Sequence, residues 1–294
     1  MIRAQGPYCG RFAPSPTGDL HFGSLIAAVA SFLEARSHGG KWLIRIEDID
    51  PPREVPGSAQ HILTDLAMLG MHSDDEVLYQ SSRMQAFEHA TKRLIEQGDA
   101  YWCGCSRSEL PSSGIYPGTC RNGISPGKRA RSVRIKTNGC SVNFLDRIQG
   151  DHSQDLEHEV GDFVIRRADG LPAYQLAVVL DDAFQSVTNV VRGADLLDST
   201  PRQIHLQKRL GLTVPQYAHV PVALNQHGAK LSKRLKSDPV SRNTPQAVIH
   251  AALAFLGQEP PHDSTLEALW DWALEHWDIE RVPKSPGMAF QSEA

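Results

Sequence analysis

The sequence predicts an α/β fold in which a parallel sheet carries an inserted subdomain and a short helical tail. Short apolar runs alternate with segments of helical spacing through the first hundred residues, a rhythm that is typical of parallel sheets. The rhythm breaks near residue 99 into short β-like runs rich in Cys, Gly and Pro, and it resumes near residue 181. We therefore expect the first half of the sheet domain over 1–98, an insert over 99–180, the second half over 181–242 and a helical tail over 243–294.

Turn residues separate the elements of the first half. The apolar run "YCGRF" ends at a turn with two prolines, and "KWLIRIED" alternates like a strand that ends in acids. Three stretches, 21–36, 57–69 and 84–97, have helical spacing, and glycine follows each of them closely. This half therefore reads strand, helix, strand, helix, helix.

The rest of the chain continues with shorter elements. In the insert, "RSVRIK" and "DFVIRR" resemble short strands. After it, the strand-like runs "SVTNVVRG" and "YAHVPVAL" flank the helix "TPRQIHLQKRL", and the polar loop "NQHGAKLSKRLKSD" follows. In the tail, the three tryptophans Trp270, Trp272 and Trp277 are expected to belong to the core.

Composition indicates a globular protein outside the membrane. Hydrophobic residues make up 40% of the 294 residues and charged residues 22%. The N-terminal residues lack the apolar core of a signal peptide, and "LIAAVASFL", the longest apolar run, is too short to span a bilayer. Five cysteines, two of them one residue apart, suit a metal site in a reducing compartment better than a set of disulfides. We therefore expect a cytoplasmic protein with no membrane partner.

Basic residues gather in two strips although the net charge is −4. Residues 121–136 hold six Lys or Arg and no acid, and residues 201–242 hold eight Lys or Arg and one acid. Local basic strips on a mildly acidic chain favour a selected anionic partner such as a nucleic acid. The alternative is an ordinary solvated face.

The stretch "RFAPSPTGDLHFGSL" predicts a phosphate-binding turn. A strand end, a Pro/Gly turn and a helix start follow one another, and helix N-termini favour anions. Gly18 and Gly23 let the backbone approach a ligand, and His21 at the helix start can donate to a phosphate oxygen. The pattern is neither a Walker loop nor G-x-G-x-x-G. A plain turn with a surface histidine is the alternative.

A second candidate for the same chemistry is "KLSKR", residues 230–234. Lys230 and Lys233 flank a serine in a loop that follows Gly228. Ammonium groups on such a loop would stabilise the charge that develops on departing pyrophosphate. Taken alone, the segment is equally an ordinary basic loop.

Together these segments resemble the catalytic half of bacterial glutamyl-tRNA synthetases, which are class I enzymes with a Rossmann-like fold. The resemblance covers residues 8–240 and rests on motifs in matching order: "RFAPSPTG", "HFGS", "GGKWLIRIEDID", "CGCS", "YPGTCR", "DFVIRRADGLPAYQLAVVLDD", "VVRGADLLDSTPRQI" and "KLSKR". Full-length synthetases continue into domains that hold the anticodon, whereas only a short tail follows Arg234 here. The chain is therefore most similar to the short members of this family.

The resemblance implies a site for ATP and glutamate. The residues implied for ATP, which Mg²⁺ normally accompanies, are His21, Gly23, Ser24 and Lys233, with Lys230 near the leaving pyrophosphate. Those implied for glutamate are Arg11, Ala13, Ser15, Glu47, Tyr174 and Arg192. An arginine provides a bidentate partner for the side-chain carboxylate, for which Arg11 and Arg192 are both candidates, and Glu47 suits the α-ammonium. The alternative for Arg11 and Glu47 is a structural ion pair.

Three cysteines predict a zinc site in the insert. Cys103, Cys105 and Cys120 lie within eighteen residues and can supply three thiolates. Their spacing leaves the fourth ligand open between Cys140 and a distant histidine, while the resemblance to the short family members implies Tyr116. One structural zinc would stabilise an insert that lacks a large core. Three free cysteines without metal are the alternative.

The short family members imply a distinct acceptor. In them glutamate is activated as glutamyl-adenylate without tRNA and is then transferred to the cyclopentenediol of queuosine, the wobble nucleoside in the anticodon loop of tRNA(Asp). Three alternatives remain open: a truncated synthetase that charges the tRNA 3′ end, a small-molecule adenylyl or nucleotidyl transferase, and a non-catalytic protein that binds tRNA or another protein. A monomer is the default expectation.

Overall fold

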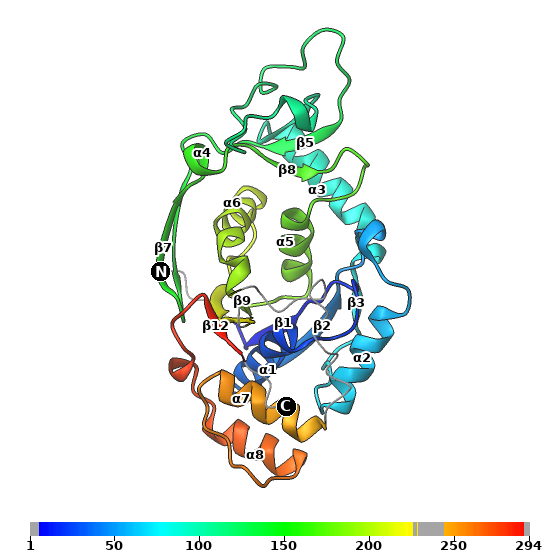
Figure 1. Cartoon of the computed structure of the whole chain (residues 1–294). Helices are drawn as coiled ribbons and strands as arrows, with labels where there is room; N and C mark the ends of the chain where they lie inside the picture. Colours follow the sequence, from blue (N-terminus) through cyan, green and yellow to red (C-terminus); the bar gives the residue numbers. More distant parts are fainter. Residues whose placement is uncertain (1–5, 226–227, 229–243, 291–294) are drawn as a thin grey trace.

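The computed structural model describes residues 6–225, 228 and 244–290. Its helices, in chain order, are α1 (Phe22–Ser37), α2 (Ser58–Met68), α3 (Met84–Glu96), α4 (Leu156–Glu159), α5 (Tyr174–Phe184), α6 (Thr200–Leu210), α7 (Pro245–Phe255) and α8 (Leu266–His276). None of these helices is long and apolar enough to cross a membrane. Figure 1 shows the tail helices α7 and α8 below α1, at the opposite end of the molecule from the insert strand β5.

Two groups of mainly parallel strands form the centre of the molecule. The first group has the order β1-β2-β3 and consists of β1 (Cys9–Phe12), β2 (Lys41–Ile46) and β3 (Leu78–Tyr79). The second has the order β7-β6-β10-β9 and consists of β6 (Ser141–Asp146), β7 (Gly150–Asp155), β9 (Asn189–Gly193) and β10 (Gln216–Val220). The groups meet where the Thr188 N–H donates to the Cys9 carbonyl at 2.9 Å, so β9 lies beside β1.

The predicted elements of the first half are confirmed within a few residues. The stretches 21–36, 57–69 and 84–97 correspond to α1, α2 and α3, and "YCGRF" and "KWLIRIED" contain β1 and β2. Helix α1 begins where the His21 Nδ1 accepts the Ser24 N–H at 3.2 Å. It ends at Ser37, and after the capping residue His38 comes Gly39, whose φ of +60° a side chain would strain.

The sequence did not predict that β6 and β7 join the central sheet. These strands lie within the expected insert, yet β6 pairs in parallel with β10 and antiparallel with β7. The rest of the insert forms a separate antiparallel sheet of β4 (Ala100–Cys103), β5 (Ser132–Ile135) and β8 (Phe163–Arg166), in the order β4-β5-β8. Helix α5 crosses the expected end of the insert at residue 180. The proposed division into domains stays a prediction.

The C-terminal tail packs on the main core. Side chains of α1, β2, α7 and α8 share one apolar cluster, in which Trp270 is 9% exposed. The Trp270 indole N–H donates to the Leu69 carbonyl at 2.8 Å, and its ring lies edge-on to Phe32. A short strand, β12 (Gly287–Ala289), pairs with β11 (Val222–Leu224), which the helical interpretation of the tail did not include. Trp270 is therefore a core residue, as predicted.

Replacing Trp270 by alanine tests the contribution of the tail to stability. Because the ring is buried and its N–H is bonded, we expect W270A to lower the free energy of unfolding by about 3–5 kcal/mol. W272A is the matched control, since the Trp272 ring is only partly buried and stacks on His276. Urea denaturation followed by circular dichroism would measure both, and equal losses would contradict this packing.

Candidate functional site

The turn between β1 and α1 is held rigidly by the elements beside it. The Glu47 N–H donates to the Pro14 carbonyl at 3.0 Å, and the Val55 N–H donates to the Pro16 carbonyl at 2.9 Å. The Ser58 hydroxyl, at the start of α2, donates to the Gly18 carbonyl at 2.5 Å. The turn is therefore fixed from β2 and α2 before any ligand binds.

His21 caps α1 as well as facing the candidate site. Its Nδ1 accepts the Ser24 N–H, and the Ser24 hydroxyl donates to the His21 carbonyl at 2.9 Å. An Nδ1 that accepts leaves the ring proton on Nε2, which is then the nitrogen able to donate to a phosphate oxygen. The helix start adds the positive end of its dipole. The sequence predicted the phosphate role of His21 but not its capping bond.

A cavity of about 520 Å³ lies where the carboxyl ends of β1 and β9 meet the start of α1. In open α/β sheets, ligands bind where the strand order reverses in this way. The nine described residues that were predicted for ATP or glutamate all line the cavity: Arg11, Ala13, Ser15, His21, Gly23, Ser24, Glu47, Tyr174 and Arg192. The other two, Lys230 and Lys233, lie outside the described residues. The structure thus brings together every residue predicted for ATP or glutamate that it describes.

Buried charges hold Arg11 and Glu47 in place, but not as a pair with each other. Arg11 Nε donates to Asp182 Oδ1 at 3.1 Å, and Arg45 Nη1 donates to the same oxygen at 2.7 Å. Arg45 Nη2 also donates to Glu47 Oε1 at 3.4 Å. Burial raises the pKa of Asp182, but Arg11 and Arg45 outweigh it and hold that pKa below its usual range. Arg11 and Glu47 are therefore each in a structural ion pair, with Asp182 and Arg45 respectively, rather than with each other.

Glu47 supplies a carboxyl group to the cavity lining. It is 8% exposed at the carboxyl end of β2, and burial raises its pKa although Arg45 opposes the shift. An approaching ammonium group would favour the ionised carboxylate. Glu47 can therefore bind a cationic group of a ligand.

Arg192 is a cationic residue of the cavity lining, and the groups that accept its hydrogen bonds are neutral. At the end of β9 it is 5% exposed. Its Nε donates to His219 Nε2 at 3.0 Å, and its Nη2 donates to the Thr200 hydroxyl at 2.9 Å and to the Leu196 carbonyl at 3.3 Å. Among the described residues no carboxylate bonds to it, and its buried Nη1 has no hydrogen-bond partner. Such a group is suited to a ligand carboxylate.

Several residues of this site escaped the sequence prediction. Arg53 and Asp195 line the cavity. Arg45 and Asp182 do not line it, but they bond to each other, and Asp182 also accepts from Arg11 of the lining. Asp195 follows the carboxyl end of β9, and because ligands bind at strand ends of this kind in open α/β sheets, its position in the sequence could have indicated it. No comparable signal marks Asp182, because it lies in the last turn of α5, far from β1 in sequence.

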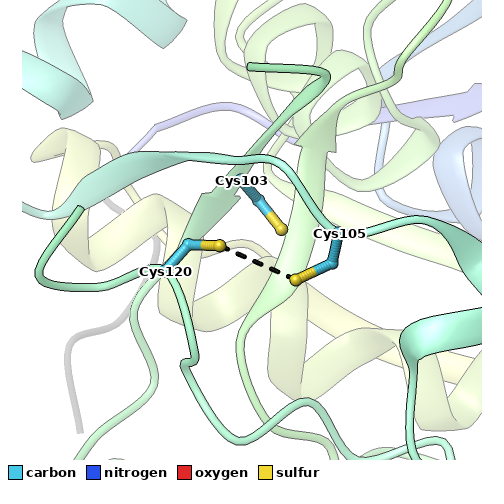
Figure 2. A group of neighbouring side chains, drawn as sticks. All are labelled: Cys103, Cys105 and Cys120. Atoms are coloured by element: carbon cyan, nitrogen blue, oxygen red, sulfur yellow. Dashed lines mark hydrogen bonds between the residues drawn. The ribbon is translucent and has the colours of Figure 1, made fainter. Parts of the chain in front are cut away.

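Three cysteine sulfur atoms converge in the insert (Figure 2). The Sγ atoms of Cys103, Cys105 and Cys120 all lie within 4.8 Å of one another, and those of Cys105 and Cys120 are 3.6 Å apart. Thiolates around a tetrahedral zinc, with bonds of about 2.3 Å, stand about 3.8 Å apart. The geometry of this cluster is therefore compatible with zinc.

Tyr116 lies against the cysteine cluster. Its hydroxyl lies 3.3 Å from the sulfurs of both Cys103 and Cys105, and it accepts the Cys120 N–H at 3.2 Å. Burial alone would raise the pKa of Cys103, but hydrogen bonds from Tyr116 and the Cys105 backbone, together with Arg134, lower it to about 7. The donor set of three thiols and one phenol fits a structural metal. Cys140 instead contacts His205 Nδ1 at 3.1 Å.

Contacts with residues outside the cysteine cluster hold Tyr116 in place. The backbones of Tyr116 and Gly161 form an isolated β-bridge. They lie so close that a Cβ at position 161 would be 2.4 Å from the Tyr116 carbonyl oxygen, so only glycine fits there. The Arg134 guanidinium lies 3.9 Å over the Tyr116 ring and donates to the Asp162 carbonyl at 2.7 Å. Arg121, next to Cys120, forms a bidentate pair with the Asp162 carboxylate. The cluster is therefore anchored to β5 and β8.

Several cations of the first basic strip, residues 121–136, contact other residues of this chain. Arg121 pairs with Asp162, Lys128 pairs with Glu109, and Arg134 is buried against Tyr116. Arg129 and Arg131 are exposed. The expectation that this strip binds phosphates therefore concerns fewer side chains than the sequence indicates.

Comparison with known proteins decides the family. The family described as "tRNA synthetases class I (E and Q), catalytic domain" matches residues 9–113 and 118–255. The chain belongs to this family. The class I tRNA synthetase resemblance predicted from the motifs is thus confirmed, and so is the α/β fold with its parallel sheet.

Two curated members of the class I tRNA synthetases are similar over almost the whole chain. The "Glutamyl-Q tRNA(Asp) synthetase" of Aromatoleum aromaticum is 50% identical over 306 residues, covering 99% of this chain and 96% of that protein. The protein of the same name from Dechloromonas aromatica is 52% identical, covering 95% and 96%. These names confirm the resemblance to the short members of the family.

A solved class I synthetase shares the fold. The glutamate tRNA ligase of Elizabethkingia meningosepticum, in complex with its amino acid, is 26% identical with a TM-score of 0.80. The match covers 98% of this chain but 68% of that ligase. The whole described fold therefore corresponds to part of a longer synthetase.

Replacing Arg45 by methionine tests the buried charge network. Arg45 is fully buried and compensates both Asp182 and Glu47, so we expect R45M to lower the free energy of unfolding by about 3–5 kcal/mol. R209M is the matched control, because Arg209 pairs with Asp99 near the surface and should contribute less than about 1 kcal/mol. Urea unfolding measures both variants. A loss in R45M no larger than in R209M would contradict the network.

Proposed function

We propose that the chain activates glutamate with ATP and transfers it to queuosine at the wobble position of tRNA(Asp). The curated relatives named for this reaction are aligned over 96% of their own length, which supports the same activity here. The single observation that carries the proposal is the cavity that Arg192 and Glu47 both line, beside the helix start at His21.

The first step of the proposed reaction needs no tRNA. An oxygen of the glutamate α-carboxylate attacks the α-phosphorus of ATP, and the bond to pyrophosphate breaks. The product is glutamyl-adenylate, and negative charge accumulates on the departing pyrophosphate. His21 and the start of α1, with Gly23 and Ser24, would hold the ATP phosphates, which Mg²⁺ would accompany. Lys230 and Lys233 would neutralise the pyrophosphate, as the sequence predicts.

The cavity charges suggest how glutamate is oriented. Arg192 would bind the side-chain carboxylate, because its Nη1 is buried and unbonded, while Arg11 is already compensated by Asp182. Glu47 would bind the α-ammonium. Ala13, Ser15 and Tyr174 would complete the pocket together with Arg11. Glutamine would be rejected, because its neutral amide leaves the guanidinium charge unpaired.

The second step of the proposed reaction uses the adenylate as an acyl donor. A hydroxyl of the queuosine cyclopentenediol attacks the activated carbonyl, an ester forms and AMP leaves. The vicinal hydroxyls of queuosine resemble those of a terminal ribose, so one site can serve either acceptor. The anticodon loop would then approach the cavity directly, and exposed cations such as Arg129 and Arg131 would meet its phosphates.

Two linked assays test the proposed function. We expect glutamate-dependent exchange between ATP and labelled pyrophosphate without tRNA, followed by transfer of labelled glutamate only to tRNA(Asp) that carries queuosine. The matched control is the same tRNA with guanosine at that position. Nuclease mapping of the product should find the label on the wobble nucleoside.

Other results of these assays would contradict the proposal in distinct ways. Label on the 3′-terminal adenosine would indicate a synthetase of the ordinary kind. Exchange without transfer to any tRNA would indicate a small-molecule adenylyl transferase. No exchange with any amino acid would indicate a non-catalytic protein.

We also propose that Cys103, Cys105, Tyr116 and Cys120 hold one structural zinc. The purified chain is expected to contain one equivalent of zinc by elemental analysis, and C105S is expected to lose it. Y116F keeps three thiolates and should bind zinc roughly ten-fold or more weakly, measured by competition with a chelator. C140S is the control and should retain the metal, since Cys140 contacts His205 instead. Full zinc content in C105S would exclude this ligand set.

A further inference from the structure

We propose that His219, oriented by Asp146, sets the position of Arg192 and thereby determines how well the site accepts the side-chain carboxylate of glutamate. The inference rests on the proposed function, in which Arg192 binds that carboxylate. His219 and Asp146 do not line the cavity, so they are positioning residues. Motif reasoning selected neither of them.

The hydrogen bonds fix which nitrogen of His219 carries its proton. Arg192 Nε lies 3.0 Å from His219 Nε2, and a guanidinium can only donate. His219 Nε2 must therefore present its lone pair, which leaves the ring proton on Nδ1. That nitrogen lies 2.5 Å from Asp146 Oδ2 and donates to it. The three side chains thus form a directional series from Asp146 through His219 to Arg192.

Asp146 is itself immobilised by the backbone. Its Oδ1 accepts the N–H groups of Ile148 at 3.1 Å, Gln149 at 2.9 Å and His219 at 3.0 Å. Asp146 is 1% exposed and His219 is fully buried. The whole carboxylate is therefore committed, with Oδ1 to the backbone and Oδ2 to the histidine.

The series leaves Arg192 positioned but still charged. Arg192 donates through Nε to His219 and through Nη2 to Thr200 and Leu196. Nη1 has no hydrogen-bond partner in the described part of the chain, so it is the nitrogen that remains for a ligand. Burial lowers the pKa of His219 to about 4, so the ring stays neutral near pH 7. The negative charge of Asp146 is separated from Arg192 by the ring. A carboxylate placed directly on Arg192 would compete with the ligand, and a neutral imidazole does not.

Replacing Asp146 by asparagine should reverse the series. The three backbone donors require an acceptor at the Oδ1 position, so the amide oxygen of asparagine goes there and its NH₂ faces His219 Nδ1. His219 then accepts through Nδ1 and carries its proton on Nε2, against the Arg192 Nε–H. We expect D146N to raise KM for glutamate roughly 10- to 100-fold in pyrophosphate exchange. Because only binding is lost, kcat should stay within about two-fold.

The H219Q variant distinguishes an effect on the orientation of the hydrogen bonds from an effect on folding. H219Q keeps an amide oxygen able to accept from Arg192, and it has no tautomer to switch. We therefore expect H219Q to recover most of the wild-type affinity, and D146N to have a much smaller effect in the H219Q background. H205N is the matched control: His205 is also buried but contacts Cys140 and Lys136, so its KM for glutamate should be unchanged.

Each outcome of this experiment has a definite meaning. A wild-type KM in D146N, or an equal effect of D146N in both backgrounds, would overturn the inference while leaving glutamate activation intact. Absence of exchange by the wild-type chain would instead reject the proposed function. Should D146N fail to fold, H219N takes its place, since the shorter asparagine keeps a donor near the Nδ1 position for Asp146 but has no acceptor at the Nε2 position that faces Arg192. An unchanged KM in H219N would then overturn the inference.

Discussion

Arg192 carries a buried positive charge, and among the described residues no carboxylate forms a hydrogen bond with it. Burying a charge without a partner opposes folding, whereas the nearby Arg45 is compensated by both Asp182 and Glu47. The two arginines therefore serve different ends: Arg45 stabilises the fold, and Arg192 keeps its attraction for a ligand. The selectivity proposed for glutamate depends on this difference.

The rest of the fold supports that charge from several directions. Strand β9 brings Arg192 beside β1, α1 presents its N-terminus to the same cavity, and β2 ends there with Glu47. The insert also contributes, because β6 joins the central sheet and supplies Asp146 behind His219. The cysteine cluster holds the outer part of the insert through Tyr116 and Arg134. The insert therefore also supports the cavity, through the contact of Asp146 with His219.

The sequence indicated which residues gather around the cavity because those signals are local. Strand ends, the Pro/Gly turn and the helix start identify Arg11, His21, Glu47 and Arg192 without any knowledge of tertiary contacts. Pairing between distant segments has no such signal. The parallel contact of β6 with β10, the Asp182 partner of Arg11 and the return of β12 onto β11 all depend on the folded chain. For the same reason the fourth position of the cysteine cluster came from family resemblance rather than from spacing.

The most direct test of the central claim is a crystal structure of the chain with glutamate bound. The account predicts that an oxygen of the side-chain carboxylate lies about 2.7–2.9 Å from Arg192 Nη1, with the α-ammonium at Glu47. A structure in which glutamate is bound with its side-chain carboxylate away from Arg192 would contradict it.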